Sequence, residues 1–150
     1  MTVPSGFMTK PWGEEVAAAI NHSPSPAYRA TKLEEYWQWV DRAKANLSTA
    51  AVLWVKDAAE GDRGRGLLMH LERGRVASTE TVEGSLGDQE AEFVLAGEMS
   101  SWRAMLEGYD VRKTVMYRRL TLDKGDVVLF FRSIYYWVEL LVALSSVPVA

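Results

Sequence analysis

The sequence lacks cysteine, so disulfide bonds, thiolate metal ligands and cysteine nucleophiles are all excluded. Histidine is almost as scarce: His22 falls in a stretch rich in proline and serine, and His70 falls in a predicted strand. The two histidines do not have the spacing of a metal site, and neither a Gly-x-Ser-x-Gly nor a P-loop motif occurs. These absences predict a protein that is not an enzyme and has no metal or cofactor.

Excess positive charge is also absent, since the 150 residues carry a formal net charge of −3. Proteins that bind nucleic acid usually have a basic face, so we expect no nucleic-acid partner. The first residues lack a basic region followed by an apolar run, so no secretory signal is predicted. We therefore expect a cytoplasmic protein, and its length fits a single domain with one hydrophobic core.

Residues 1–46 are predicted to form a helical extension that packs on this domain. Apolar residues recur at helical spacing from Trp12 to Ile20, and the prolines and serines of residues 21–26 end that helix. A second helix is predicted to begin near Ser25 or Thr31 and to reach Ala45. Its apolar face consists of Leu33, Tyr36, Trp37, Val40 and Ala43, while Trp39 lies off this face.

Residues 47–150 are predicted to form the core of the domain. From residue 49 the apolar period changes from helical to alternating, which indicates strands near residues 49–56, 67–72, 76–83 and 91–95. A helix over residues 96–107 ends at Gly108, and a short helical turn over residues 110–116 follows. A fifth strand is predicted over residues 118–122, with a turn or cap at residues 123–126.

The last part, residues 127–147, is almost wholly apolar and is predicted to form one long helix. Arg132 and Glu139 argue against a membrane span, because a charge at the centre of a bilayer costs about 2.5–3.5 kcal/mol. The narrow stripe formed by Arg132, Tyr136, Glu139, Ala143 and Ser146 is expected to face water. The remaining surface is too broad for one small sheet face to cover, so either a filled core, a partner or an internal ligand must cover it.

The order of these segments resembles the sterol carrier protein type 2 family of small lipid-binding domains, over about residues 47–147. Each motif is weak alone, and their order and spacing carry the resemblance. One departure is that Arg118 or Arg119 stands where the family has a glycine before its fifth strand. The matching segments are residues 67–71 before Gly74, residues 93–95 before Trp102, residues 105–108, residues 116–122 with 124–126, and the apolar closing helix.

The resemblance implies an α+β fold, with a five-stranded, mixed and mostly antiparallel sheet covered on one side by helices. It further implies an internal apolar tunnel that binds or carries a fatty acyl chain, a sterol or a similar ligand. Tyr109, Tyr135 or Arg132 would meet a polar head at the tunnel mouth. The residues expected to contact the ligand are Trp102, Met105, Leu106, Tyr109, Met116, Phe130, Ile134, Trp137, Val138 and Leu141.

Two alternatives stay open at the level of sequence. In the first, the same fold has a filled core, and its surplus aromatic surface forms a homodimer or docks a partner enzyme. Trp39 and the N-terminal helices would then lie in the interface. In the second, the domain has an uncharacterised hydrolase or transferase activity, for which His22 and His70 are the only imidazole bases. The periodicity of the apolar residues cannot distinguish a filled core from a ligand tunnel.

Overall fold

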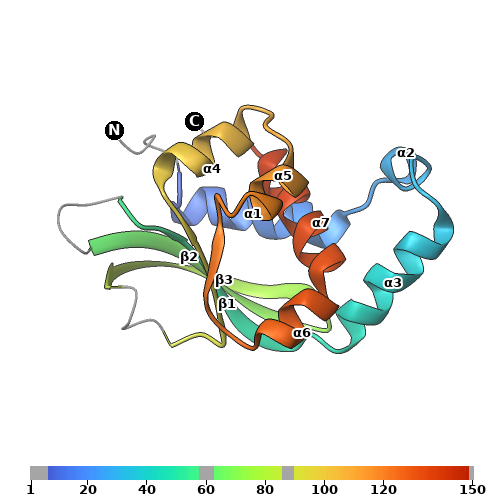
Figure 1. Cartoon of the computed structure of the whole chain (residues 1–150), viewed down its shortest axis with the longest axis horizontal. Helices are drawn as coiled ribbons and strands as arrows, with labels where there is room; N and C mark the ends of the chain where they lie inside the picture. The colour runs from blue at the N-terminus through green and yellow to red at the C-terminus, as the bar shows by residue number, and fades with distance from the viewer. Residues whose placement is uncertain (1–6, 58–62, 86–89, 149–150) are drawn as a thin grey trace.

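The computed structural model describes residues 7–57, 63–85 and 90–148, and it combines a curved sheet with a layer of helices (Figure 1). The predicted change from helical to alternating period falls between a helix that ends at Ala45 and a strand that begins at Thr49. The elements in chain order are α1 (Lys10–His22), α2 (Pro26–Arg29), α3 (Glu34–Ala45), β1 (Thr49–Val55), β2 (Arg63–Glu72), β3 (Arg75–Ser85), β4 (Phe93–Gly97), α4 (Met99–Leu106), α5 (Val111–Met116), β5 (Thr121–Lys124), α6 (Val127–Arg132) and α7 (Ile134–Ser145).

The five strands form one mixed sheet in the order β3-β2-β1-β4-β5. Strands β1, β2 and β3 form an antiparallel meander, β1 pairs with β4 in parallel, and β4 pairs with β5 antiparallel. Helices α4 and α5 lie in the connection between β4 and β5. The predicted fold class, α+β with a five-stranded and mostly antiparallel sheet, is confirmed.

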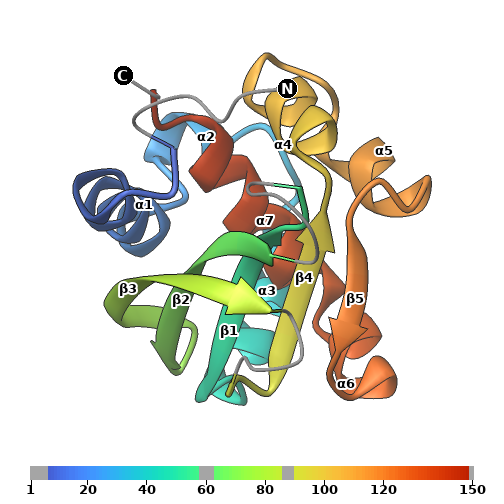
Figure 2. The same ribbon diagram turned by 90° about the vertical axis from the view of Figure 1, so that its left-hand side faces the viewer.

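One face of the sheet carries the main hydrophobic core. Leu53, Leu67 and Phe93 point from adjacent strands toward the helices, where Val16 of α1 and Trp137 of α7 belong to the same buried cluster. Figure 2 shows α3 and α7 behind the sheet, while β3 and β2 curve toward the viewer. Successive side chains of a strand point to opposite faces of the sheet, so every second side chain of these strands lies in this core.

The opposite face of the sheet is also buried at its centre. Trp54 and Val94 are fully buried there, and Trp54 lies over two glycines of β2. A Cβ atom on Gly66 would approach Trp54 Cε3 to 2.8 Å, and one on Gly64 would approach Trp54 Nε1 to 2.6 Å. The carbonyl oxygens of β1 are nearer still, with Leu53 O at 2.5 Å from a Gly66 Cβ and Val55 O closer than this to a Gly64 Cβ. Because the indole and these backbone atoms occupy the space, β2 carries glycine at both positions. Burial on both faces explains why β1 is apolar along most of its length.

The predicted single helix over residues 127–147 is wrong, since the chain forms α6 and α7 with a break at Ser133. Ser133 Oγ donates to Leu129 O at 2.7 Å and to Phe130 O at 3.2 Å, and it accepts from Trp137 Nε1 at 3.0 Å. A serine that binds the carbonyl groups three and four residues earlier competes with the helical ladder. The break therefore has a local cause within an otherwise apolar stretch.

Other predicted segments are displaced, among them β2, which begins at Arg63 instead of residue 67. The helix expected from residue 25 or 31 is divided, because Ser25 caps the short α2 and α3 begins only at Glu34, which leaves Leu33 exposed. The helix expected from residue 96 begins at Met99, because Gly97 still pairs with β1. The fifth strand begins at Thr121 instead of residue 118, because Arg118, at φ 59°, belongs to the turn that ends α5.

Candidate functional site

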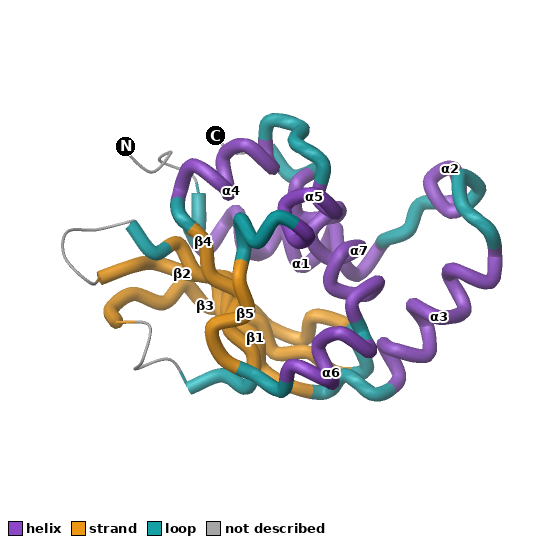
Figure 3. The backbone as a smooth tube through the Cα atoms, viewed as in Figure 1, coloured by secondary structure: helices purple, strands orange, loops and turns teal. Residues whose placement is uncertain are grey.

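An apolar groove of about 450 Å³ lies between the β5 edge of the sheet and helices α5 and α6. We call it the β5–α6 groove, and the position of α6 beside β5 can be followed in Figures 2 and 3. Its volume is within the range of about 300–1,000 Å³ that is usual for small-molecule sites. It is lined by Leu95, Val115, Met116, Arg118, Leu120, Thr121, Leu122, Val127, Phe130, Phe131 and Ile134.

Local structure opens this groove to the surface. Asp126 accepts a hydrogen bond from Leu129 N at 3.1 Å, so α6 begins immediately after the β5 turn and remains close to β5. Three large apolar side chains at the rim are mostly exposed: Met116 at 73%, Val127 at 56% and Phe131 at 62%. Apolar side chains that stay in water at the edge of a groove indicate a surface suited to an apolar ligand.

The groove offers few polar contacts. Among the described residues that line it, Arg118 alone is charged. Thr121 Oγ1 is already occupied, since it donates to Asp123 Oδ1 at 2.5 Å and lies 3.4 Å from Ala96 O. An apolar chain bound along these walls would therefore remove few polar groups of the protein from water. A polar end of the same ligand would lie near the Arg118 guanidinium.

The residues predicted to bind a ligand do not share one place in the structure. Three of them line the β5–α6 groove: Met116, Phe130 and Ile134. Three others, Met105, Tyr109 and Val138, line another pocket of about 340 Å³ that is more polar. Tyr28, Lys32 and Arg112 also line this pocket. Leu106 lines a further pocket near the C-terminal end of α7.

The last three predicted ligand contacts, Trp102, Trp137 and Leu141, lie inside the packed core and are fully buried. The Trp137 ring stacks on Phe130 with a centroid distance of 5.6 Å and lies 5.4 Å from Phe93. Trp102 Nε1 donates to the Trp54 carbonyl oxygen at 3.0 Å. At these positions α7 closes over aromatic rings, and the groove lies to one side of them, along α6.

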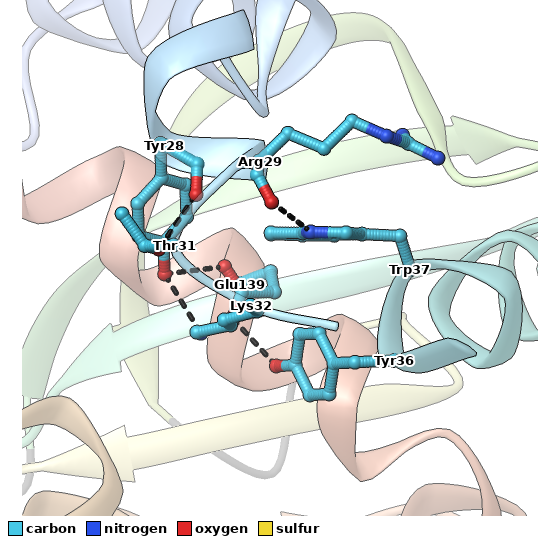
Figure 4. Close-up of polar contacts among 7 residues, drawn as sticks. All are labelled: Tyr28, Arg29, Thr31, Lys32, Tyr36, Trp37 and Glu139. Atoms are coloured by element: carbon cyan, nitrogen blue, oxygen red, sulfur yellow. Dashed lines mark hydrogen bonds and ion pairs between the residues drawn. The ribbon is translucent and has the colours of Figure 1, made fainter. Parts of the chain in front are cut away.

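A buried carboxylate connects the N-terminal segment to α7. Glu139 is 5% exposed, and its two oxygens accept hydrogen bonds from Tyr28 Oη at 2.8 Å, Lys32 Nζ at 2.7 Å and Tyr36 Oη at 2.6 Å (Figure 4). Lys32 Nζ also lies 4.6 Å from the centre of the Tyr36 ring and 5.5 Å from the Trp37 ring. We call Tyr28, Lys32, Tyr36 and Glu139 the Glu139 cluster.

The environment of this cluster also changes the acidity of its phenols. Burial, followed by the hydrogen bond to Glu139, raises the pKa of Tyr36 well above its ordinary value. The pKa of Tyr28 is raised as well, first by burial, although its hydrogen bond to Lys32 acts in the opposite direction. Both phenols therefore stay protonated and donate to the carboxylate, which compensates its burial.

The predicted water-facing stripe of the last helix is therefore wrong over most of its length. Arg132 and Ser146 at its two ends are exposed as predicted, but Tyr136, Glu139 and Ala143 between them are buried. Tyr136 Oη donates to Gly74 O at 2.7 Å, and the N-terminal segment covers Glu139. No local pattern indicated Tyr28 and Lys32 as partners, because they lie 111 and 107 residues from Glu139.

Two kinds of feature are absent from the residues that the structure describes. No group of three or more histidine, aspartate and glutamate residues in this part of the chain is placed to hold a metal ion. No helix within the same ranges has both the length and the hydropathy required to cross a membrane.

Neither a protein-family model nor a curated protein matches the sequence. Among solved structures, a crystal structure of sterol carrier protein 2 aligns with a TM-score of 0.71 at 21% identity, covering 95% of this chain and 99% of the other. A solution structure from Thermus thermophilus, of a conserved hypothetical protein described as possibly a sterol carrier protein, aligns with a TM-score of 0.67 at 20% identity. It covers 100% of this chain and 97% of the other.

These likenesses identify the fold. The chain has the sterol carrier protein 2 fold, as its sequence motifs predicted, and the alignment includes the N-terminal helices that no motif had matched. The five-stranded sheet with helices on one face is the common architecture.

Proposed function

We propose that this protein binds and carries an apolar or amphipathic lipid-like ligand without transforming it, and that the β5–α6 groove holds the apolar part. The observation that carries the proposal is the groove itself: an open volume of about 450 Å³ with apolar walls and one arginine. The likeness to a structure described as sterol carrier protein 2 supports the same class of ligand.

The energetics suit a chain-like ligand. Each buried methylene contributes about 0.8 kcal/mol, so a chain of roughly a dozen carbons retains several kcal/mol after the cost of ordering it. Met116 and Phe131 at the rim can change rotamer at little cost, because they are exposed. A fatty acyl chain or a sterol would satisfy these walls, with a carboxylate or hydroxyl near Arg118.

The proposal can be tested by native mass spectrometry of the purified 16.8 kDa chain, followed by solvent extraction. We expect an apolar small molecule at close to one per chain, or stoichiometric uptake of a fluorescent fatty acid by the empty protein. A ligand-free mass together with no uptake would contradict the proposal.

A matched pair of variants locates the ligand on α6. Phe131 and Val128 are almost equally exposed, at 62% and 61%, but only Phe131 lines the groove. Phe131→Ala should weaken binding of the fluorescent fatty acid about tenfold, because apolar contact worth roughly 1.4 kcal/mol is lost. Val128→Ala should bind as the unmodified protein does. Equal affinities for the two variants would place the ligand elsewhere.

The dimer predicted as the alternative retains one specific observation in its favour. Trp39 and Val128 are apolar side chains exposed at 50% and 61%, and an interface with a second copy would remove them from water. Sedimentation equilibrium distinguishes the two roles: a mass near that of one chain supports the carrier, and twice that mass supports an interface.

A further inference from the structure

A second pocket lies on the other side of α6, between α6 and α3. It has a volume of about 510 Å³, and we call it the α3–α6 pocket. The β5–α6 groove and the α3–α6 pocket share no lining residue, so each can be tested separately. The α3–α6 pocket is lined by Trp39, Arg42, Ala43, Asn46, Leu47, Leu129, Arg132, Ser133 and Tyr135.

The charges of this pocket have one sign. Arg42 comes from α3 and Arg132 from the last residue of α6, and none of the lining residues is acidic. Over the parts of the chain that the structure describes, neither guanidinium forms an ion pair, and the bridges that do form use other basic residues. Both arginines are exposed, so their positive charges face the pocket and the solvent without a neutralising carboxylate among the lining residues.

The remaining polar groups do not neutralise these arginines. Ser133 Oγ already donates to Leu129 O and accepts from Trp137 Nε1. The Asn46 amide donates to the backbone carbonyl of Arg42. The pocket therefore presents an excess of hydrogen-bond donors, and guanidinium donors match the oxygens of a carboxylate or phosphate.

The wall of the pocket is aromatic. Trp39 and Tyr135 stack with a centroid distance of 6.0 Å and an interplanar angle of 17°, although they are 50% and 42% exposed. Tyr36 packs edge-on against Tyr135 at 5.1 Å, and Tyr36 is itself fixed by Glu139. The stacked pair is therefore held in place from behind, and one face of Trp39 stays open to a ligand.

We propose that the α3–α6 pocket binds an anion, a phosphate or carboxylate group, whose apolar part lies on Trp39. Arg42 and Arg132 hold the anion from two sides, and Leu47 and Leu129 contribute apolar contacts. The site does not depend on the proposed function of the β5–α6 groove. The same chemistry fits either the head group of a lipid or a free organic phosphate.

The experiment follows the Trp39 indole N–H signal by NMR, assigned with a Trp39→Phe variant, during titration with phenyl phosphate. We expect saturable shifts in the unmodified protein and binding at least tenfold weaker in Arg42→Gln and in Arg132→Gln. Arg75→Gln is the matched control, because Arg75 is an exposed arginine of β3, outside the pocket. Unchanged binding in both pocket variants, or the absence of a Trp39 shift, would overturn the proposal.

Two further probes identify the source of the anion. Dodecyl phosphate is compared with phenyl phosphate in the unmodified protein and in Phe131→Ala. If dodecyl phosphate binds more tightly, and this difference disappears in Phe131→Ala, the pocket holds a lipid head group whose chain reaches the β5–α6 groove. Equal binding of phenyl phosphate and dodecyl phosphate assigns the pocket to a soluble phosphate. Failure of fatty-acid uptake with intact phenyl phosphate binding would reject the carrier function and leave the anion site supported.

Discussion

Helices α6 and α7 come from one apolar stretch of sequence, yet they lie in opposite environments. Eight of the 12 residues of α7 are buried, including a glutamate, whereas only Phe130 is buried among the six residues of α6. The sheet, α1 and α3 cover α7, while α6 has a groove on one side and a pocket on the other. Apolar composition therefore does not decide burial; the elements available to cover the surface do.

Within α6, the sharpest contrast is between the adjacent residues Phe130 and Phe131. Phe130→Ala should lower the free energy of unfolding by about 3–5 kcal/mol, because a ring stacked on Trp137 is replaced by a cavity. Phe131→Ala should cost less than about 1 kcal/mol, since that ring is mostly exposed. Urea unfolding of both variants measures the difference, and similar losses would mean that α6 packs on both sides.

In α7, the comparison depends on the Glu139 cluster. Lys32→Met removes the only cation bound to the buried carboxylate within the described residues, and it should cost about 3 kcal/mol of unfolding free energy. This figure is at the lower end for buried pairs because the Lys32 side chain is 21% exposed. Lys113→Met, at an exposed position of α5, should have an effect below about 0.5 kcal/mol. A loss below about 1 kcal/mol in Lys32→Met would show that the cluster contributes little to holding the N-terminal segment.

Because α7 is buried, the free energy of unfolding should also depend on pH. Burial raises the pKa of Tyr136 above its ordinary value of 10.0. The unfolded chain therefore releases this proton first, so the stability present below pH 10 falls as the pH rises further. Between pH 8 and about pH 10.5 Tyr136 should account for about 1 kcal/mol of the loss in urea unfolding, and Tyr28 and Tyr36, whose pKa values are also raised, should add to it.

The matched variants for this pH effect are Tyr136→Phe and Tyr117→Phe. Tyr136→Phe should remove about 1 kcal/mol of the loss, whereas Tyr117→Phe, which alters an exposed phenol, should retain it. The same loss in Tyr136→Phe as in the unmodified protein would mean that the Tyr136 phenol does not resist ionisation.

The strands and most helices could be predicted because their apolar periods are local. The break at Ser133 could not, since neither glycine nor proline marks it and its cause is a side chain bonded to Leu129 and Phe130 carbonyl groups. The start of β5 was displaced because Arg118 adopts the left-handed conformation, which sequence patterns rarely reveal for arginine.

The candidate site was less accessible to prediction, for two physical reasons. A helical period identifies which residues share a face of α7, but it cannot distinguish water from the distant phenols and lysine that cover Glu139. It also cannot distinguish rings that fill a core, such as Trp137, from rings that line a groove, such as Phe131. Met116, Phe130 and Ile134 were predicted ligand contacts and do line the groove, although their role in binding is still a prediction.

The central claim is that an apolar ligand occupies the β5–α6 groove beside α6, and isoleucine methyl NMR tests it most directly. The chain has two isoleucines: Ile134 lines the groove, and Ile20, a buried residue of α1, lies in the core. Addition of dodecanoic acid should shift the Ile134 δ1 methyl signal and give contacts between this methyl and the acyl chain, while the Ile20 signal stays in place. A saturable shift at Ile20 alone, or at neither residue, would contradict the account.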